Sequence, residues 1–566
     1  MASTHTATEL QELPPVTMLP CLDRPKRPTT SYGRTPSYPD SIQPLTPATP
    51  AQQTPPSRVF EATPSVTSTK RLLIITLIVV ANTIQFTSAF STIAGGIAIN
   101  KVLGQDIGPG QANWMAAAYS LTQGAFVLIT GRLGAIYGHQ RLTLIGLLLF
   151  SVFSLINGFC SSHASFVALR ALTGIGGGVF MPNAVATIML MVPPGRARNV
   201  LMGLFAASPP VGGVMGALLA GVVAEKDKFS AWTVFFGMLA ASSLACLTWL
   251  WVVLPEEHPV DKGGKIDYVG AFLGLGSLLL FNFTWNQAPV SGWDTPYLIA
   301  ALCLSVVLFI AFILWERSPY PTEPIMPLAV FAAPTFSALI VVVTLSYMTV
   351  GICMWYSLSW QQVLRGVSVL ECGINFLPFG IGSVAAVALS AYLVPRVAAQ
   401  WIMAIGLVSG LIASLLIATQ PVQQSYWPQM FPAIVSLGFS PDFLYLAAQI
   451  IASNSVSRKH QGVASSLIGT LNLYGNALGL GVAATIETEV VKRSEGPGSS
   501  SGENSVIGYR AALYFGAGIA AVSLLLNFVF VRVPKNDREG WEEDSAPVEQ
   551  EAGVVLASAI QRRNAV

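Results

Sequence analysis

Two ionisable residues stand inside long apolar stretches, and each carries a side chain that can hold a charge or a proton. Arg170 lies within residues 164–192, and Asp442 follows Pro441 within residues 427–451. Apolar surroundings favour the neutral form of a carboxylic acid, so Asp442 is predicted to take up and release a proton. Arg170 is predicted to face protein or a wet cavity, because a lone charge among apolar groups is costly. The alternatives are an arginine that reaches the lipid headgroups and a Pro-Asp pair that caps a local kink.

The stretches that must position these two residues are typical of membrane spans. Hydrophobic residues make up 52% of the 566 residues, charged residues make up 10%, and the mean hydropathy is +0.59. A lipid-embedded helix needs about 20 apolar residues, because no water is present to bond its backbone. The sequence therefore predicts an all-α polytopic membrane protein. We expect about fourteen transmembrane helices, at residues 72–99, 113–133, 142–160, 164–192, 199–224, 231–254, 268–286, 296–315, 334–356, 370–394, 401–419, 427–451 (broken around Pro441), 461–486 and 509–533.

Enzymatic chemistry has no support in the residue pattern. The six cysteines include no CxxC pair, and the five histidines fall in tails or at loop edges. The run GIGGG at 174–178 lies in the middle of a span without a preceding strand, unlike a nucleotide-binding loop. We predict that the protein is not an enzyme, binds no metal and needs no cofactor, with a proton gradient as its energy source. The net charge of +2 gives no reason to expect nucleic acid as a partner.

Composition divides the chain into tails, bundles and a linker. The first segment is polar and rich in Pro, Thr and Ser, so we expect a disordered cytosolic tail. The loop 487–508 is expected to be flexible and external, which places Glu487 and Glu489 outside the membrane. The predicted segments are the N-terminal tail at 1–69, an N-terminal six-helix bundle at 70–254, a linker with two inserted helices at 255–333, a C-terminal six-helix bundle at 334–533 and a cytosolic C-terminal tail at 534–566.

Lysine and arginine are distributed unevenly between the two sets of loops. The set on the same side as the tails holds about twice as many as the other set. Because cytosolic loops carry the excess of positive charge, both termini are predicted to be cytosolic. Without a recognised retention signal, the plasma membrane is the expected location. The expected partners are the lipid bilayer, protons and a small organic substrate, and the expected oligomeric state is a monomer.

The two halves of the chain echo each other at an offset of about 260 residues. Pro182-Asn183 in the fourth span corresponds to Pro441-Asp442 in the twelfth. Parallel repeats of this kind predict two bundles that rock against each other around a site at the membrane midplane. Residues 131–146 align with residues 391–406, and the matched pairs are Leu133/Leu393, Gln140/Gln400, Ile145/Ile405 and Gly146/Gly406.

The segment GRLGAIYGHQR at 131–141 resembles the loop motif between the second and third helices of the major facilitator superfamily. The resemblance is to its fourteen-helix drug:proton antiporter branch, and within that branch to the fungal aminotriazole-resistance type, over about residues 70–533. In the family an acid at the fifth motif position locks the inward-closed state. Ala135 occupies that position, which implies a lock that is weakened or rebuilt elsewhere, while Arg141 keeps one charge. The motif glycines, which allow a tight turn and close packing, are Gly131, Gly134 and Gly138.

Two further motifs carry the resemblance. RALTG at 170–174 resembles the fourth-helix RxxxG motif, whose arginine faces the central cavity in the family and is linked to proton coupling. SPPVGG at 208–213 resembles the GPxxGG motif of exporters, with Ser208 in place of the leading glycine. Proline removes a backbone hydrogen bond and glycine allows close approach, so Pro209, Gly212 and Gly213 are expected to form a bendable seam.

The first helix departs from the branch. The stretch ANTIQFTSAFSTIAGGIAI holds no carboxylate, so proton carriage must use another residue, and Arg170 and Asp442 are the predicted coupling pair facing one cavity. Aromatic and amide side chains suit bulky, weakly polar substrates. The candidates for the substrate cavity are Gln85, Tyr119, Gln123, Asn183, Trp355, Tyr356, Asn375, Gln449, Asn472 and Asn476.

These observations predict a transporter of the major facilitator type. The leading hypothesis is proton-coupled efflux of small organic compounds, such as drugs, toxins or a fungal secondary metabolite, by alternating access. One alternative is a carrier of a small solute such as borate or ammonium. Another is a non-transporting receptor on the same scaffold, since both the first-helix acid and the acid of the loop motif are missing.

Overall fold

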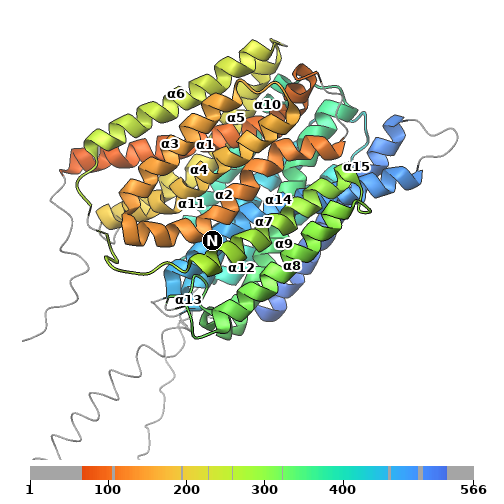
Figure 1. Cartoon of the computed structure of the whole chain (residues 1–566). Coiled ribbons are helices and arrows are strands. Elements are labelled where there is room, and N and C mark those ends of the chain that lie inside the picture. The colour runs from red at the N-terminus through yellow and green to blue at the C-terminus, as the bar shows by residue number, and fades with distance from the viewer. Residues whose placement is uncertain are drawn as a thin grey trace, which may run out of the picture. The chain divides into compact units, whose positions relative to one another are not determined.

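The computed structural model describes residues 67–104, 109–192, 196–226, 228–257, 259–321, 323–456, 460–494 and 501–531. All of them belong to one compact unit. Every regular element within these ranges is a helix, and Figure 1 shows the long helices lying side by side. The two predicted tails lie almost wholly outside the described residues.

Six helices form the first bundle. α1 packs along α5, α3 packs between α4 and α6, and α2 packs against α4. Side-chain oxygens start two of the helices, because Thr67 accepts a hydrogen bond from the Lys70 amide and Ser162 accepts one from the Ser165 amide. The bounds are α1 Ser68–Val102, α2 Pro109–Tyr137, α3 His139–Asn157, α4 His163–Met191, α5 Arg196–Ala224 and α6 Phe229–Val253.

The second bundle repeats this packing. α9 packs along α14, α12 packs between α13 and α15, and α11 packs against α13. Each contact therefore has a counterpart in the first bundle, with α9 in the place of α1. The bounds are α9 Pro334–Ser359, α10 Val369–Asn375, α11 Leu377–Leu393, α12 Ala399–Thr419, α13 Met430–Asn454, α14 Gln461–Ser494 and α15 Ser501–Phe530, with short helical turns at η2 Leu328–Ala332 and η3 Trp360–Leu364.

Gly146 and Gly406, which the repeat alignment pairs, occupy matching places. A methyl group on Gly146 of α3 would lie 2.6 Å from the backbone nitrogen of Phe180 in α4. A methyl group on Gly406 of α12 would lie 3.0 Å from the carbonyl oxygen of Ser440 in α13. Each glycine thus lets the third helix of its bundle approach the fourth closely.

Two further helices, α7 (Tyr268–Ser291) and α8 (Pro296–Arg317), are inserted between the bundles. They pack on each other, and α7 also packs against α2 and α14. Trp114 of α2 donates a 2.9 Å hydrogen bond to Gln287, and Asn286 donates a 3.1 Å bond to the carbonyl of Ala477. α7 is therefore bonded to one helix of each bundle.

The predicted fold class is confirmed: two six-helix bundles with two inserted helices. With α10 and α11 counted as one span, thirteen helices within the described ranges are long and apolar enough to cross a membrane. α2, which is 29 residues long and carries Asn113, Gln123 and Arg132, is not among them. Because successive helices run in opposite directions, their connections fall on two sides. We call the side where α1 begins the terminal side and the opposite side the distal side.

Two local predictions were wrong. The span around Pro441 is not broken, because α13 remains helical from Met430 to Asn454 with that proline inside. The segment 487–508 is not one long loop, because α14 continues to Ser494 and α15 begins at Ser501. Both helices continue past the apolar span because their side chains pack together there, as the Glu487 contacts described below illustrate.

Candidate substrate and proton sites

Arg170 is fully buried between α1, α2 and α4. Its guanidinium donates to the Ser88 hydroxyl at 2.8 Å, to the Ser88 carbonyl at 3.1 Å and to the Thr92 hydroxyl at 3.4 Å. The same group lies over Tyr119, 4.8 Å from the ring centroid. Its Nε has no hydrogen-bond partner among the described residues. The side chain is held inside the first bundle, so the alternative of an arginine that reaches the headgroups is wrong.

Three polar side chains converge on Gly177, about two turns along α4 from Arg170. A methyl group on Gly177 would lie 2.5 Å from the Tyr119 hydroxyl, 3.1 Å from Nε2 of Gln123 and 3.2 Å from Oε1 of Gln85. All three side chains are at most 1% exposed. These three atoms have no hydrogen-bond partner within the described ranges. We call Gln85, Tyr119, Gln123 and Gly177 the polar cluster.

α1 and α5 meet along a seam of small residues. The side-chain amide of Asn82 donates a 2.7 Å hydrogen bond to Ser208, which replaces the leading glycine of the exporter motif. A methyl group on Gly212 would lie 2.5 Å from the Thr83 carbonyl oxygen, and one on Gly213 would lie 3.1 Å from the Phe90 ring. Pro209 lies inside α5 between these contacts. Because proline has no backbone N–H, α5 lacks one of its helical hydrogen bonds at this position.

Asp442 lies in the middle of α13, next to Ser383 of α11 and Tyr347 of α9. The Tyr347 hydroxyl donates a 3.0 Å hydrogen bond to the Pro441 carbonyl. Oδ2 of Asp442 is buried without a hydrogen-bond partner, and none of the ion pairs in the described part of the chain includes this residue. A carboxyl group without a cationic partner can gain a proton without breaking an ion pair.

Glu487 lies within α14 and not in the predicted loop, and its carboxyl group is buried. Its side chain is 3% exposed and accepts a 2.6 Å hydrogen bond from the Tyr356 hydroxyl of α9. The Tyr356 ring packs edge-on against Tyr509 of α15 at 5.2 Å between centroids. The helical spacing could have indicated this burial. Glu487 follows the buried Ala483 by four residues and the buried Leu480 by seven, so all three lie on the same face of α14.

Acidic residues of the linker make contacts with the end of α2, just before its connection to α3. Arg132 pairs with Asp261 at 2.8 Å and also with Glu323. The backbone amide of Asp261 donates a 2.9 Å hydrogen bond to the carbonyl of Ala135, the position where the family's acid is missing. Of the two alternatives for the charge lock, these contacts favour one that is rebuilt from the linker.

The start of α3 is capped by another linker acid. Glu257 accepts hydrogen bonds from the backbone amides of His139 at 2.9 Å and Gln140 at 2.7 Å. A carboxylate at this position also complements the positive end of the helix dipole. Gly138 precedes the helix with φ of +105°, a conformation that favours glycine. Arg141, the last residue of the motif, is exposed.

The motif glycines of α2 lie against neighbouring helices. A methyl group on Gly134 would collide with the Asn183 side chain, and one on Gly131 would lie 3.3 Å from Oγ of Ser466 in α14. Asn183 donates to the carbonyls of Thr130 and Val179 and contacts the His139 ring. These bonds join α2, α3 and α4, so Asn183 takes part in helix packing in this conformation.

The remaining cavity candidates lie in the second bundle. Asn375, the last residue of α10, donates to Gln361. Gln449 of α13 exchanges two hydrogen bonds with Ser465 of α14. Asn476 donates to Asn472 one turn earlier in α14, and Trp355 is buried at 4% exposure. None of these contacts brings the side chains to the polar cluster, so the sequence-derived set divides between the two bundles.

Arg170 and Asp442 also lie in different bundles. α4 packs with α1, α2, α3 and α5, whereas α13 packs with α9, α11, α12 and α14. Their helices correspond to each other through the repeat, but each residue lies within its own set of helices. In this conformation the two side chains are therefore not in contact with each other, and the predicted shared cavity is not formed in that way.

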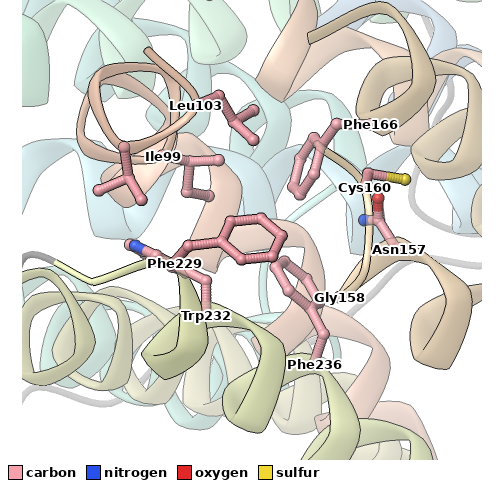
Figure 2. A pocket seen from close by; sticks show the side chains of 10 residues that line it. Ile99, Leu103, Asn157, Gly158, Cys160, Phe166, Phe229, Trp232 and Phe236 are labelled. Carbon is pink, nitrogen blue, oxygen red and sulfur yellow. The ribbon is translucent and has the colours of Figure 1, made fainter. Parts of the chain in front are cut away.

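A crevice lies at the distal end of the first bundle, between α1, α3, α4 and α6. Figure 2 shows the rings of Phe166, Phe229 and Phe236 around it. Asn157 is the one amide on its wall. An apolar crevice of this kind orients no polar ligand, so the chemically informative sites remain the polar cluster, Asp442 and Glu487.

A helical membrane protein built from two repeated bundles, with ionisable groups buried inside each, defines a transporter scaffold. Residues 80–480 match the sequence profile of the Major Facilitator Superfamily. The chain belongs to this superfamily and is a multi-pass membrane transporter, which confirms the resemblance inferred from the motifs.

Several characterised relatives are fungal. The chain is 33% identical to a major facilitator superfamily multidrug transporter of Aspergillus fumigatus, covering 80% of this chain and 79% of that one. It is 32% identical to the low affinity ammonium transporter of Saccharomyces cerevisiae, over 74% and 80% of the two chains. It is 29% identical to the aminotriazole resistance protein of the same yeast, over 74% and 76%.

Solved structures support the fold. The crystal structure of the peptide transporter POT in complex with sulfate superposes with a TM-score of 0.58, at 16% sequence identity, covering 81% of this chain and 93% of that one. At this identity the likeness concerns the arrangement of helices alone.

Proposed function

We propose that the protein is a proton-coupled exporter of small organic compounds that works by alternating access. The observation that carries this proposal is Asp442, a membrane-embedded carboxyl group whose Oδ2 is buried without a hydrogen-bond partner. The similarity to a multidrug transporter supports the substrate class. The substrate would cross the membrane without being chemically changed.

The proton step follows from the environment of Asp442. A carboxyl group in low-polarity surroundings is most stable when neutral, and contact with water favours its ionised form. Movement of the bundles that changes water access to α13 would therefore drive proton uptake on one side and release on the other. Glu487, buried beside Tyr356, is a second group of the same chemistry.

The conformational step would use the interfaces between the bundles. A methyl group on Gly124 of α2 would lie 2.9 Å from the Tyr474 amide nitrogen in α14. A methyl group on Gly373 of α10 would lie 2.8 Å from the Ala217 carbonyl in α5. Helices that meet through glycine present smooth backbone surfaces, which can roll or separate without unlocking large side chains. The seam of α1 and α5 would bend during this movement.

The electrochemical gradient of protons would supply the energy, with no bound cofactor. We place the transporter in the plasma membrane as a monomer, with the terminal side facing the cytosol, because the loops of that side carry the excess of lysine and arginine. This orientation puts the pair formed by Arg132 and Asp261 on the cytosolic side.

A carrier of a small solute is the second candidate. The similarity to the yeast low affinity ammonium transporter favours it. Against a cationic solute stands Arg170, whose buried guanidinium would repel ammonium at the polar cluster. A neutral or anionic small solute such as borate meets no such repulsion.

The test is gradient-driven flux in proteoliposomes that contain the wild-type protein or Asp442→Asn, with a panel of organic dyes and borate. We expect the wild type to move at least one dye when a proton gradient is applied and Asp442→Asn to lose the dependence on the gradient. Glu371→Gln is the matched control, because it also converts an acid to an amide but at an exposed position at the start of α10. Equal gradient dependence of wild type and Asp442→Asn would rule out this residue as the proton carrier.

A further inference from the structure

The first bundle contains a buried positive charge, Arg170, and none of its six helices carries an acid that could neutralise it. Helices α1 to α6 include no aspartate or glutamate anywhere in their sequences. The ion pairs in the described part of the chain do not involve Arg170, whose guanidinium donates hydrogen bonds to Ser88 and Thr92 and lies over the Tyr119 ring. Hydroxyl and carbonyl groups stabilise a buried cation only partly, so the site favours an anion from outside the protein.

The polar cluster offers the donors that such an anion needs. The Tyr119 hydroxyl and Nε2 of Gln123 lie side by side over Gly177 without partners. Gln85 presents its acceptor Oε1 to the same point, and its donor Nε2 is also without a partner among the described residues. Tyr119 joins this cluster to the cation, because its ring lies under the Arg170 guanidinium. A buried donor without an acceptor costs free energy, because it has lost its hydrogen bonds to water. A bound ligand that supplies the acceptor would remove this cost.

We propose that the polar cluster and Arg170 bind the carboxylate of an organic anion, the substrate of this transporter. One unpaired guanidinium balances one negative charge, which fits a monoanion better than a dianionic phosphate. The two carboxylate oxygens can accept from Arg170, Tyr119 and the two glutamines. The absence of an acid from α1 to α6 also argues against a lipophilic cation at this place.

The division of charge between the bundles gives this site a distinct role. Asp442 and Glu487 both belong to the second bundle, whereas the buried Arg170 belongs to the first. Substrate anion and proton would therefore bind to different bundles and would not compete for one group. This inference rests on the proposed export function, which it refines by naming the substrate class.

Binding can be measured without transport. The purified full-length protein would be titrated with 4-phenylbutyrate, with its amide and with 4-phenylbutylamine, and the melting temperature recorded by tryptophan fluorescence. We expect a saturable rise with the carboxylate and none with the amide or the amine, because these share the carbon skeleton but lack the negative charge. A ligand that binds only the folded state raises the melting temperature.

Gly177→Ala is the decisive variant, because its methyl group fills the space among Tyr119, Gln123 and Gln85 while Arg170 stays in place. We expect carboxylate affinity to fall by about tenfold or more, the usual effect of losing hydrogen bonds to a charged group. Gly469→Ala is the matched control, since its methyl group would only meet Val127 at 3.5 Å. Arg170→Gln should abolish the carboxylate response.

Three results would overturn the inference: no response to the carboxylate in the folded wild type, an equal response to the amide or amine, or an unchanged response in Gly177→Ala. Flux measurements separate this inference from the proposed function. Gradient-driven dye efflux without carboxylate binding would reject the anion site alone. Carboxylate binding without any gradient-driven flux would reject the export function alone.

Discussion

The hydroxyl of Tyr356 donates a 2.6 Å hydrogen bond to Glu487, which lies 131 residues further along the chain. The bond joins α9 to α14 near the distal side, where Tyr509 of α15 packs against the same tyrosine ring. An acid held by a neutral donor in the bundle interior keeps its ability to exchange a proton, whereas an ion pair would suppress it. The relationship therefore connects the stability of the second bundle to its proton chemistry.

Removal of this hydrogen bond should destabilise the protein. Tyr356→Phe is expected to lower stability by about 1–3 kcal/mol, because the buried Glu487 loses its donor. In a double-mutant cycle with Glu487→Gln the two effects should be non-additive. Melting temperatures in detergent check this, with Tyr514→Phe, an exposed tyrosine of α15, as the control. Additive effects of the two substitutions would contradict a direct interaction.

Arg170 should separate stability from function. Arg170→Met replaces a buried, unpaired charge by an apolar side chain of similar length, a change that is commonly neutral or stabilising. We expect an unchanged or higher melting temperature together with loss of substrate-dependent flux. Thermal unfolding and proteoliposome flux on the same preparation test this. A strongly destabilised variant would instead assign the arginine a structural role through Ser88.

The cap on α3 can be tested at two adjacent acids. Glu257→Ala removes the acceptor of the His139 and Gln140 amides and should cost about 0.5–2 kcal/mol, as for other helix caps. Glu256→Ala, at the neighbouring exposed position, should have no comparable effect. The difference in melting temperature between the two variants is the measurement. Similar losses in both would mean that the charge of the linker matters and the cap does not.

Gly146 and Gly406 should respond alike to a methyl group. Gly146→Ala and Gly406→Ala each push the third helix of a bundle away from the fourth, and overpacking of this kind typically costs about 1–3 kcal/mol. Gly237→Ala in α6 meets nothing within 4 Å and serves as the control. Folded yield and melting temperature report the effect. Tolerance at Gly406 alone would show that the second bundle packs more loosely.

Much of the fold could be predicted because a membrane imposes it. Length and apolarity alone place the spans, since backbone groups in lipid must be bonded within each helix. The repeat, the loop motif and the exporter motif are local patterns and needed no tertiary information. Glu487 was misplaced because its helix extends beyond the apolar window, and apolarity was the signal in use.

The sequence by itself determined the number of helices, the family and the presence of Arg170 and Asp442 within spans. Only the tertiary structure decided what these residues meet: Tyr119 for the arginine, and for Asp442 no cation among the described residues. It also decided that the linker acid Asp261 pairs with Arg132 and that its backbone amide bonds to the Ala135 carbonyl. The physical reason is that partners across helices depend on the rotation of each helix about its axis. Packing among all the helices fixes that rotation, and no local pattern encodes it.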